Sequence, residues 1–408
     1  MPHVRYTRLP AIALALSLCL AGCAISPPPT KASVTRSSTS VPSATTVTPT
    51  PTPVPTPTPV PTPTPAPSRT ASLVMNGDLL WHNTVFWSAQ AEARRTGKGI
   101  DGFDFDPMFA ALKPVVSGAD VAICQEEVPF AAPGGPYLGY PVFAAPPQIA
   151  AWLGTMGYDA CTTDSNHSID QGFTGLVRTA TLLEQAGVRH VGTFRTAEER
   201  TKPVIVQTAA GVKGGIVGGT YSLNGLALPK DKQWAVSLWD APNLLAQAHA
   251  ARLAGADIVV VQIHGGNEYQ ARPTAEQEAL AAVLTASDDV DLVFGQHVHV
   301  VQPVTKVNGK WVVYGMGNLI AQQPTTQPRT YEGLTMRFTF TGAVGGRFTV
   351  TKAEYIGTLM TYGDPIRVYP VVSSLAAGAG PTARLQTARA AIAASVNLLG
   401  AQPDLVES

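Results

Sequence analysis

Short apolar runs rich in β-branched residues recur between residues 72 and 314 of the chain. Runs of this length and composition are typical of strands in the interior of a sheet. The predicted strands are Ser72–Met75, Asp120–Cys124, Val188–Val191, Val204–Val206, Ile216–Thr220, Asp257–Ile263, Asp291–Phe294 and Trp311–Tyr314.

Stretches between several of these runs repeat apolar residues at three- and four-residue spacing. That spacing places the apolar side chains on one face of a helix. The alternation of strands with helices therefore predicts βαβ units, in which helices cover a buried sheet. The predicted helices are Pro146–Met156, Gly172–Ala186, Ala241–Leu253 and Thr274–Ala286.

The C-terminal third of the chain follows a different pattern. Two longer runs, Gly333–Thr341 and Gly346–Tyr355, predict the strands of a hairpin that turns at the glycines between them. Residues 71–371 together have a length suited to one α/β domain. Residues 372–408 are predicted to form a tail, with an alanine-rich helix at Pro381–Leu399.

The N-terminus has the features of an export signal. Two arginines precede the apolar run Ala11–Leu20, which is too short to span a bilayer as a permanent helix. A basic start followed by a short apolar core is typical of a signal peptide. The run leads into Ala21-Gly22-Cys23, which resembles the end of a bacterial lipobox.

The lipobox resemblance implies that residues 1–22 are a lipoprotein signal peptide and that Cys23 is acylated after cleavage. An ordinary signal peptide with an incidental cysteine is the alternative. Acylation at Cys23 would place the chain outside the cytoplasm with the membrane as a partner, because each buried methylene of an acyl chain contributes about 0.8 kcal/mol to anchoring.

Residues 23–70 continue as a stretch dominated by proline, threonine, serine and valine. Such a composition has too little apolar surface to offset the entropy of folding. Alternating prolines favour an extended spacer of about 3.1 Å per residue. We therefore expect a tether between the lipid and the folded domain.

Charge and cysteine content narrow the function classes. Lys+Arg and Asp+Glu each number 28, so no basic excess indicates a nucleic-acid partner. Of four cysteines, Cys19 leaves with the signal peptide and Cys23 is lipidated, so Cys124 and Cys161 remain. Two cysteines do not make a disulfide framework, and their pairing in an oxidising compartment is the less favoured alternative.

Metal-binding residue types follow several of the predicted strands. The carboxyl ends of parallel strands meet at one edge of a sheet, so side chains that follow them can converge. Taken alone, each is explained as a turn residue, a helix cap or a core histidine, but together they predict a metal site. These residues are Asp78, Glu127, Asn166, His167, His264, His297 and His299. We expect His297 and His299, two apart on an extended segment, to point the same way.

Six short motifs in order resemble the CapA family. They are Gly77-Asp78, Glu127-x-Pro129, Ser165-Asn166-His167-x-x-Asp170-x-Gly172, His264-Gly265-Gly266-x-Glu268-Tyr269, Gly295-x-His297-x-His299-Val300-x-Gln302-Pro303 and Gly315-x-Gly317-Asn318. CapA proteins are associated with poly-γ-glutamate capsule production. The resemblance implies an α/β fold, a four-layer α/β/β/α sandwich of the metallo-dependent phosphatase type.

The same resemblance implies two divalent metal ions, with Mn, Fe, Zn and Mg all open. One metal would be held by Asp78 and His299 and bridged by Glu127 to the other. The second would be held by the remaining three ligands, Asn166, His264 and His297. His82 either completes the first metal's ligands or acts as a helix cap or a support for them.

Two metals favour attack on a phosphate ester. His167 would then protonate the leaving group, oriented by Asp170. Glu268 would hold His264 in its ligating tautomer, and Gln302 and Asn318 would support ligands or contact substrate. For Asp170, Glu268 and Asn318, a structural turn role is the alternative.

The sequence leaves the function between three hypotheses. The first is a metal-dependent hydrolase of a phosphate ester or related bond at the cell envelope. The second is a capsule or cell-wall component that binds, exports or tethers an anionic polymer without hydrolysing it. The third is an anchored binding domain whose site has decayed, against which every metal-type position in the motifs carries a residue able to bind a metal.

Overall fold

A computed structural model describes residues 67–408, which contain two β-sheets. The first sheet has the order β14-β13-β12-β1-β2-β3-β4, with β11 beside β1 and β15 beside β13. Its strands are β1 (Ser68–Leu79), β2 (Val121–Glu126), β3 (Ala160–Thr162), β4 (Arg189–Val191), β11 (Asn318–Ile320), β12 (Glu332–Ala343), β13 (Thr349–Met360), β14 (Val368–Pro370) and β15 (Leu405–Glu407).

The second sheet has the order β5-β6-β7-β8-β10-β9, and β6, β7, β8 and β10 run parallel. Its strands are β5 (Val204–Gln207), β6 (Lys213–Thr220), β7 (Ile258–His264), β8 (Leu292–Gln296), β9 (Val304–Val307) and β10 (Lys310–Val313).

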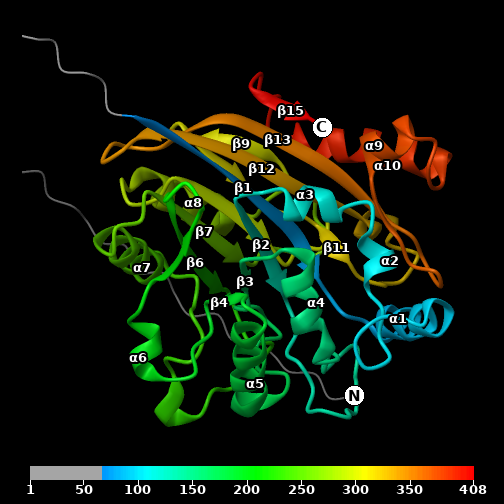
Figure 1. Ribbon diagram of the computed structural model, residues 1–408. Helices are drawn as coiled ribbons and strands as arrows, with labels where there is room; N and C mark the ends of the chain where they lie inside the picture. Colours follow the sequence, from blue (N-terminus) through cyan, green and yellow to red (C-terminus); the bar gives the residue numbers. More distant parts are fainter. Residues whose placement is uncertain (1–66) are drawn as a thin grey trace, which may run out of the picture. The chain divides into compact units, whose positions relative to one another are not determined.

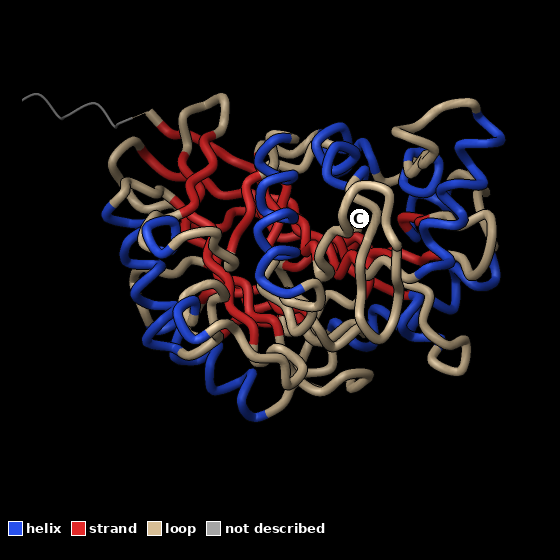
Figure 2. The backbone as a smooth tube through the Cα atoms, turned by 90° about the horizontal axis from the view of Figure 1, so that it is seen from below, coloured by secondary structure: helices blue, strands red, loops and turns tan. Residues whose placement is uncertain are grey.

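Helices and short helical turns cover the outer faces of the two sheets. Figures 1 and 2 show the strands in the interior with helices outside them. The helices are α1 (Asn83–Thr96), α2 (Asp106–Phe109), α3 (Lys113–Ser117), α4 (Gln148–Met156), α5 (Gly172–Gln185), α6 (Ala197–Arg200), α7 (Ala241–Leu253), α8 (Ala275–Ala286), α9 (Val371–Ala376) and α10 (Thr382–Val396), with 3-10 turns at Lys230–Lys232 and Pro328–Tyr331.

Strand β7 shows how the sequence builds this layering. Val260 packs into the main core between the two sheets, together with Phe294 of β8. The neighbouring Val259 and Val261 face the other way, into the core under α7 and α8. Because side chains alternate between faces of a strand, only a continuous apolar run buries both faces. The result is the α/β/β/α sandwich that the family resemblance implied.

The two cysteines of the folded domain lie at directly paired positions on β2 and β3. A disulfide joins Cys124 to Cys161, whose Cα atoms are 4.4 Å apart. The sequence favoured unpaired cysteines because it did not reveal that β3 lies next to β2. This register is what brings the sulfur atoms together.

The C-terminal tail packs on the long hairpin. Leu385 and Ile392 of α10 belong to the main core, and β15 pairs in parallel with β13. The predicted boundary between residues 71–371 and 372–408 stays a prediction. The signal peptide, Cys23 and nearly all of the 23–70 tether lie outside the described residues. Within residues 67–408, no helix combines the length and apolarity of a membrane span.

Candidate metal centre

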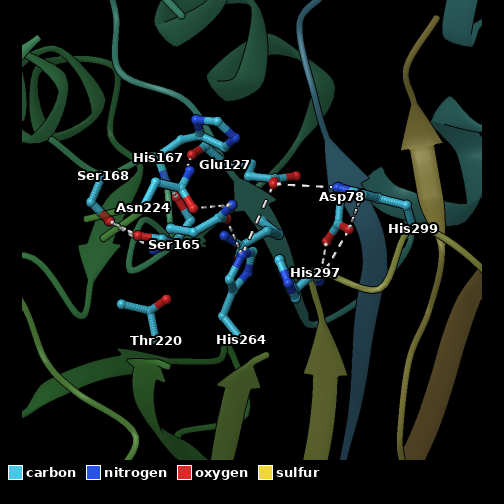
Figure 3. Close-up of polar contacts among 12 residues, drawn as sticks. Asp78, Glu127, Ser165, His167, Ser168, Thr220, Asn224, His264, His297 and His299 are labelled. Atoms are coloured by element: carbon cyan, nitrogen blue, oxygen red, sulfur yellow. Dashed lines mark hydrogen bonds and ion pairs between the residues drawn. The ribbon is translucent and has the colours of Figure 1, made fainter. Parts of the chain in front are cut away.

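The strand ends of both sheets bring the predicted side chains to one place (Figure 3). Asp78 is the penultimate residue of β1, and Glu127 directly follows β2. From the second sheet, His264 ends β7 and His297 directly follows β8. The two sheets therefore contribute carboxylates and imidazoles, respectively, to the same centre.

Glu127 occupies the middle of this centre. Its side chain is fully buried, and neither carboxyl oxygen has a hydrogen-bond partner in residues 67–408. Oε1 lies 3.9 Å from Nε2 of His264 and 3.9 Å from Nε2 of His299. Burial raises the pKa of Glu127 well above its usual value. A buried carboxyl without partners is costly unless a proton or a cation satisfies it.

Asn166 and His264 form one side of the centre. Oδ1 of Asn166 lies within hydrogen-bonding distance of Nε2 of His264, 2.9 Å away. The Asn166 amide nitrogen donates to Oδ1 of Asn224, 3.3 Å away, which turns the Asn166 oxygen toward His264. Burial lowers the pKa of His264 well below its usual value, so the imidazole is in its neutral, ligating form.

Asp78, His299 and Asn318 form the other side. Nδ1 of His299 lies 3.2 Å from Oδ2 of Asp78 and 2.9 Å from Oδ1 of Asn318. These acceptors hold the proton on Nδ1 and leave Nε2 directed to Glu127. Burial alone would lower the pKa of His299, but Glu127 and Asp78 outweigh it and raise that pKa to about 9. The centre thus favours a positive charge between its carboxylates.

The expectation that His297 and His299 lie on an extended segment is wrong. Their φ angles are 89° and 58°, so both adopt left-handed backbone conformations that side chains disfavour. The backbone N–H of His297 donates to Oδ2 of Asp78, 3.2 Å away. Such conformations cost about 1–3 kcal/mol each and persist where surrounding contacts impose them. The two rings still converge, with centroids 5.9 Å apart.

The Gly77-Asp78 motif has a steric reason. A Cβ on Gly77 would lie 2.3 Å from the carbonyl oxygen of Gly317. With no side chain there, β1 approaches the loop before β11, and the N–H of Asp78 donates to that oxygen at 2.9 Å. Two of the six motifs therefore build one backbone contact beneath the centre.

His167 stands at the rim of the centre. Its Nδ1 lies 2.7 Å from Oδ2 of Asp170, and the backbone N–H of Phe143 donates to the same carboxyl oxygen at 2.8 Å. Ser165 holds the turn by accepting the His167 N–H at 3.0 Å. Because Asp170 engages Nδ1, Nε2 of His167 is the nitrogen left for a ligand.

His82 does not contact the other candidate ligands. Its Nδ1 lies 3.2 Å from the backbone nitrogen of Gln322 and 3.2 Å from the carbonyl oxygen of Leu80. Burial lowers the pKa of His82 to about 4. The role of His82 as a ligand of the first metal stays a prediction. His82 also begins helix α1 as its N-cap, although its side chain makes no capping hydrogen bond.

Glu268 and Gln302 lie apart from the ligands. Glu268 is exposed, and Nδ1 of His264 has no partner in the described part of the chain, so the predicted support of His264 by Glu268 is not what the structure shows. The loop after β7 carries Glu268 away from that ring. The buried Gln302 accepts from Gln277 at 3.0 Å and donates to the backbone oxygen of Gln270 at 2.8 Å, which holds this loop in place.

Two contributors were missed from the sequence. Asn224 orients Asn166, and the Tyr221 ring packs on His297 with centroids 4.6 Å apart. Both belong to the loop after β6, where Asn224-Gly225 reads only as a turn signal. Nothing in that local pattern points to the centre.

A cleft of about 980 Å³ opens from the centre to solvent. His167, Asn166 and His299 line its floor, and Glu268 lies in its wall. Below them lie the buried oxygens of Glu127 and the buried Nδ1 atoms of His264 and His297, which have no hydrogen-bond partner within residues 67–408. Carboxylate oxygens and neutral imidazoles together suit divalent transition-metal ions, so the residues present fit such a metal.

Comparisons with known proteins agree with the motifs. The family model of the bacterial capsule synthesis protein PGA_cap matches residues 72–323. The PGA biosynthesis protein CapA of Bacillus subtilis is 28% identical over 202 residues, covering 50% of this chain and 52% of that protein. The capsule biosynthesis protein CapA of Bacillus anthracis is 27% identical over 178 residues, 42% of each protein. The chain thus spans about half the length of these curated relatives.

Solved structures show a weaker likeness. The calcineurin-like phosphoesterase YfkN from Bacillus subtilis is 15% identical with a TM-score of 0.42, covering 80% of this chain and 98% of that one. A phosphatase from Mycoplasma pneumoniae is 13% identical with a TM-score of 0.44, covering 73% and 95%. Scores at this level carry no argument about activity. The family match, in contrast, extends over more than half of the sequence, and the chain belongs to the PGA_cap family of bacterial capsule synthesis proteins.

Proposed function

We propose that this chain is a metal-dependent hydrolase that cleaves a phosphate ester or a related bond during synthesis of a capsule or another envelope polymer. The buried Glu127 carboxyl carries this proposal. Its two oxygens have no partner in residues 67–408, and its ligand atoms and those of His297 and His299 lie within 4.8 Å of one another. An arrangement that is costly without a cation is the expected form of a metal-binding centre.

The chain offers ligands for two divalent ions. They would be held by Asp78, Glu127, Asn166, His264, His297 and His299. When bound, such ions supply Lewis-acid stabilisation and a nucleophile at neutral pH. The imidazole and carboxylate donors suit Mn, Fe or Zn, and the carboxylates also suit Mg.

The remaining groups position the ester and move a proton. Asp170 accepts from Nδ1 of His167 and keeps Nε2 aimed into the cleft. Nε2 can then donate a proton to the leaving oxygen, as a general acid does. His82 lines the same cleft, where its ring can form a hydrogen bond to the ester.

The proposal includes the location of the domain. We propose that residues 1–22 are removed, that Cys23 carries lipid, and that the following residues to about position 70 tether the domain outside the cytoplasm. The names of the Bacillus relatives, which refer to capsule and PGA biosynthesis, support an envelope role. A Cys23→Ala variant is expected to leave the membrane fraction, and continued retention there would contradict the anchor.

The test uses the full chain in detergent. We expect bound divalent metal and Mn²⁺-dependent hydrolysis of bis-p-nitrophenyl phosphate. For phenyl phosphate, whose leaving oxygen depends more on protonation than that of a p-nitrophenyl ester, His167→Ala should lower kcat by about 10²-fold or more and keep the metal, because His167 acts on the leaving group alone. His249→Ala is the matched control, since its side chain is 60% exposed and pairs with Asp289 away from the centre.

Two outcomes would contradict the proposal that the chain is a hydrolase. Bound metal without turnover of any ester, combined with retention of poly-γ-glutamate, would favour the second candidate, a polymer-binding or tethering component. Absence of stoichiometric metal would exclude both and leave a decayed site.

A further inference from the structure

The wall of the cleft differs in chemistry from its floor. Among residues 67–408, no lysine or arginine lines the cleft. The charged residues of its lining, apart from histidines, are Asp170, which is bound to His167, and the exposed Glu268. An anionic polymer would therefore meet no cationic side chain along this wall, and its charges would be repelled by Glu268.

Three tyrosines, Tyr140, Tyr269 and Tyr362, line the cleft with accessible rings, and Tyr140 is 76% exposed. Tyr269 is 38% exposed and Tyr362 is 67% exposed. Large aromatic rings left open to solvent within a cleft offer flat apolar faces with a polar tip. Such rings bind with little loss of side-chain entropy, because only two torsions are fixed.

Tyr269 is held in place beside the metal centre. Its backbone has a φ of 62°, and its N–H donates to the carbonyl oxygen of Val298 at 2.8 Å. Gln323 donates its side-chain N–H to the Tyr269 hydroxyl at 3.4 Å. The ring centroid lies 6.1 Å from that of His299. These contacts maintain a disfavoured backbone conformation, which positions the Tyr269 ring beside His299 of the metal centre.

Tyr362 is fixed by its backbone. The Gln322 amide donates to the carbonyl oxygen of Thr361 and accepts the N–H of Gly363, each at 3.0 Å. Tyr362 lies between those two contacts, so its exposed ring is attached to a backbone segment that is fixed on both sides. A segment whose backbone is already fixed loses less entropy when a ligand packs on its ring.

Neutral hydrogen-bonding groups also line the wall, between apolar residues such as Pro141, Val142 and Leu226. The hydrogen-bonding groups include the side chains of Asn224, Gln323, Thr325 and Thr326. Amides and hydroxyls both donate and accept hydrogen bonds. A saccharide presents the matching chemistry, with hydroxyls that donate and accept around apolar ring faces. A nucleobase would use an aromatic face but leave many of these dispersed groups unpaired.

We infer that the cleft selects phosphate esters of uncharged, hydroxyl-rich saccharides. Tyr269 and Tyr362 pack against sugar rings, and Glu268 accepts hydrogen bonds from sugar hydroxyls while repelling anionic polymers. This inference rests on the proposed hydrolase and specifies the group that flanks its reacting bond.

The first test compares esters that differ only in the flanking group. For the Mn²⁺-loaded full chain, kcat/KM for maltotriose 1-phosphate should exceed that for phenyl phosphate by about tenfold or more. The double variant Tyr269→Ala/Tyr362→Ala should reduce this preference about tenfold, mainly through KM. Trp87→Ala, which removes a 55% exposed ring outside the cleft, should keep it. A stronger preference for adenosine 5′-monophosphate would overturn the inference in favour of a nucleotide.

The second test does not depend on turnover. Calorimetric titration of the metal-free full chain should show binding of maltohexaose and none of hexa-γ-glutamate. Glu268→Lys should weaken the binding of maltohexaose and introduce binding of hexa-γ-glutamate. Tighter binding of hexa-γ-glutamate to the unmodified chain, or no saccharide binding, would overturn the inference. The tyrosine double variant could lose saccharide binding while the unmodified chain fails to hydrolyse phenyl phosphate. That combination would contradict the proposed hydrolase and still support the saccharide site.

Discussion

Two clusters of histidine and carboxylate within residues 67–408 have similar composition but differ in whether their polar atoms have hydrogen-bond or ion-pair partners. One is the candidate metal centre around Glu127. The other lies where β4, α5 and α6 meet, where His190 contacts Glu184 through Nδ1 at 2.9 Å and Glu199 through Nε2 at 3.4 Å (Figure 1). Arg195 also pairs with Glu199.

In the second cluster both nitrogens of His190 and both carboxylates have partners. At the metal centre, the oxygens of Glu127 have none in residues 67–408. The carboxylates around His190 are also about a quarter exposed, whereas Glu127 is fully buried. Residue types alone therefore do not distinguish a ligand-binding cluster from a structural ion network. The distinguishing feature is buried oxygen or nitrogen atoms that have no hydrogen-bond or ion-pair partner.

The largest effect should follow from changing Glu127. We expect Glu127→Gln to lower hydrolysis by at least about 10²-fold, because it removes a charged ligand. The free energy of unfolding of the metal-free chain should change by about 1 kcal/mol or less, since the carboxyl makes no hydrogen bond within residues 67–408. Added Mn²⁺ should raise the Tm of the unmodified chain and not that of the variant, because only a bound ion shifts the equilibrium.

The corresponding change in the His190 cluster should lower the stability of the chain and leave metal binding and hydrolysis unchanged. Glu199 accepts from the backbone N–H of Arg195 at 2.6 Å and from its Nε at 3.0 Å. Removing the charge in Glu199→Gln should lower the free energy of unfolding by about 1–2 kcal/mol, measured by urea denaturation, because charge-assisted hydrogen bonds weaken. Metal content and kcat should match those of the unmodified chain. A loss of metal in this variant would remove the distinction between the clusters.

Elements with strong local signals were predictable. Helix α7 has the predicted bounds, and Asp240 caps it by accepting the N–H of Asn243. Thr274 and Gln277 form a capping box at the start of α8. Helix α1 was missed because these signals are absent: its N-cap, His82, makes no side-chain cap, and the first turn carries no acidic residue. Burial of one face holds this helix, and burial depends on the tertiary fold.

Some residues of the metal centre could likewise be predicted from the sequence, and others could not. Asp78, Glu127 and His264 could be predicted because strand ends converge in a sheet regardless of loop detail. Asn224 could not, because its contact with Asn166 depends on the path of a loop 58 residues away in sequence. Glu268 was misplaced for the same reason. Loop conformation is set by distant contacts, such as those of Gln302, that leave no local pattern.

The smallest effect concerns pH. Burial alone would lower the pKa of His190, but Glu184 and Glu199 outweigh it and raise that pKa above 6.5. The pKa of Glu184 is lowered from 4.5, chiefly by its hydrogen bond to His190. The imidazolium contribution is therefore complete below 6.5 and lost as pH rises through the raised pKa, while the carboxylate contribution is complete above 4.5 and lost as pH falls. A His190→Gln variant should thus be destabilised most between about pH 4.5 and 6.5, by on the order of 1 kcal/mol because its partly exposed partners are screened. Thermal unfolding of both proteins from pH 4 to pH 9 measures this difference. A gap that widened above pH 8 would show that His190 contributes as a neutral ring, and that the two clusters differ less in charge than their contacts indicate.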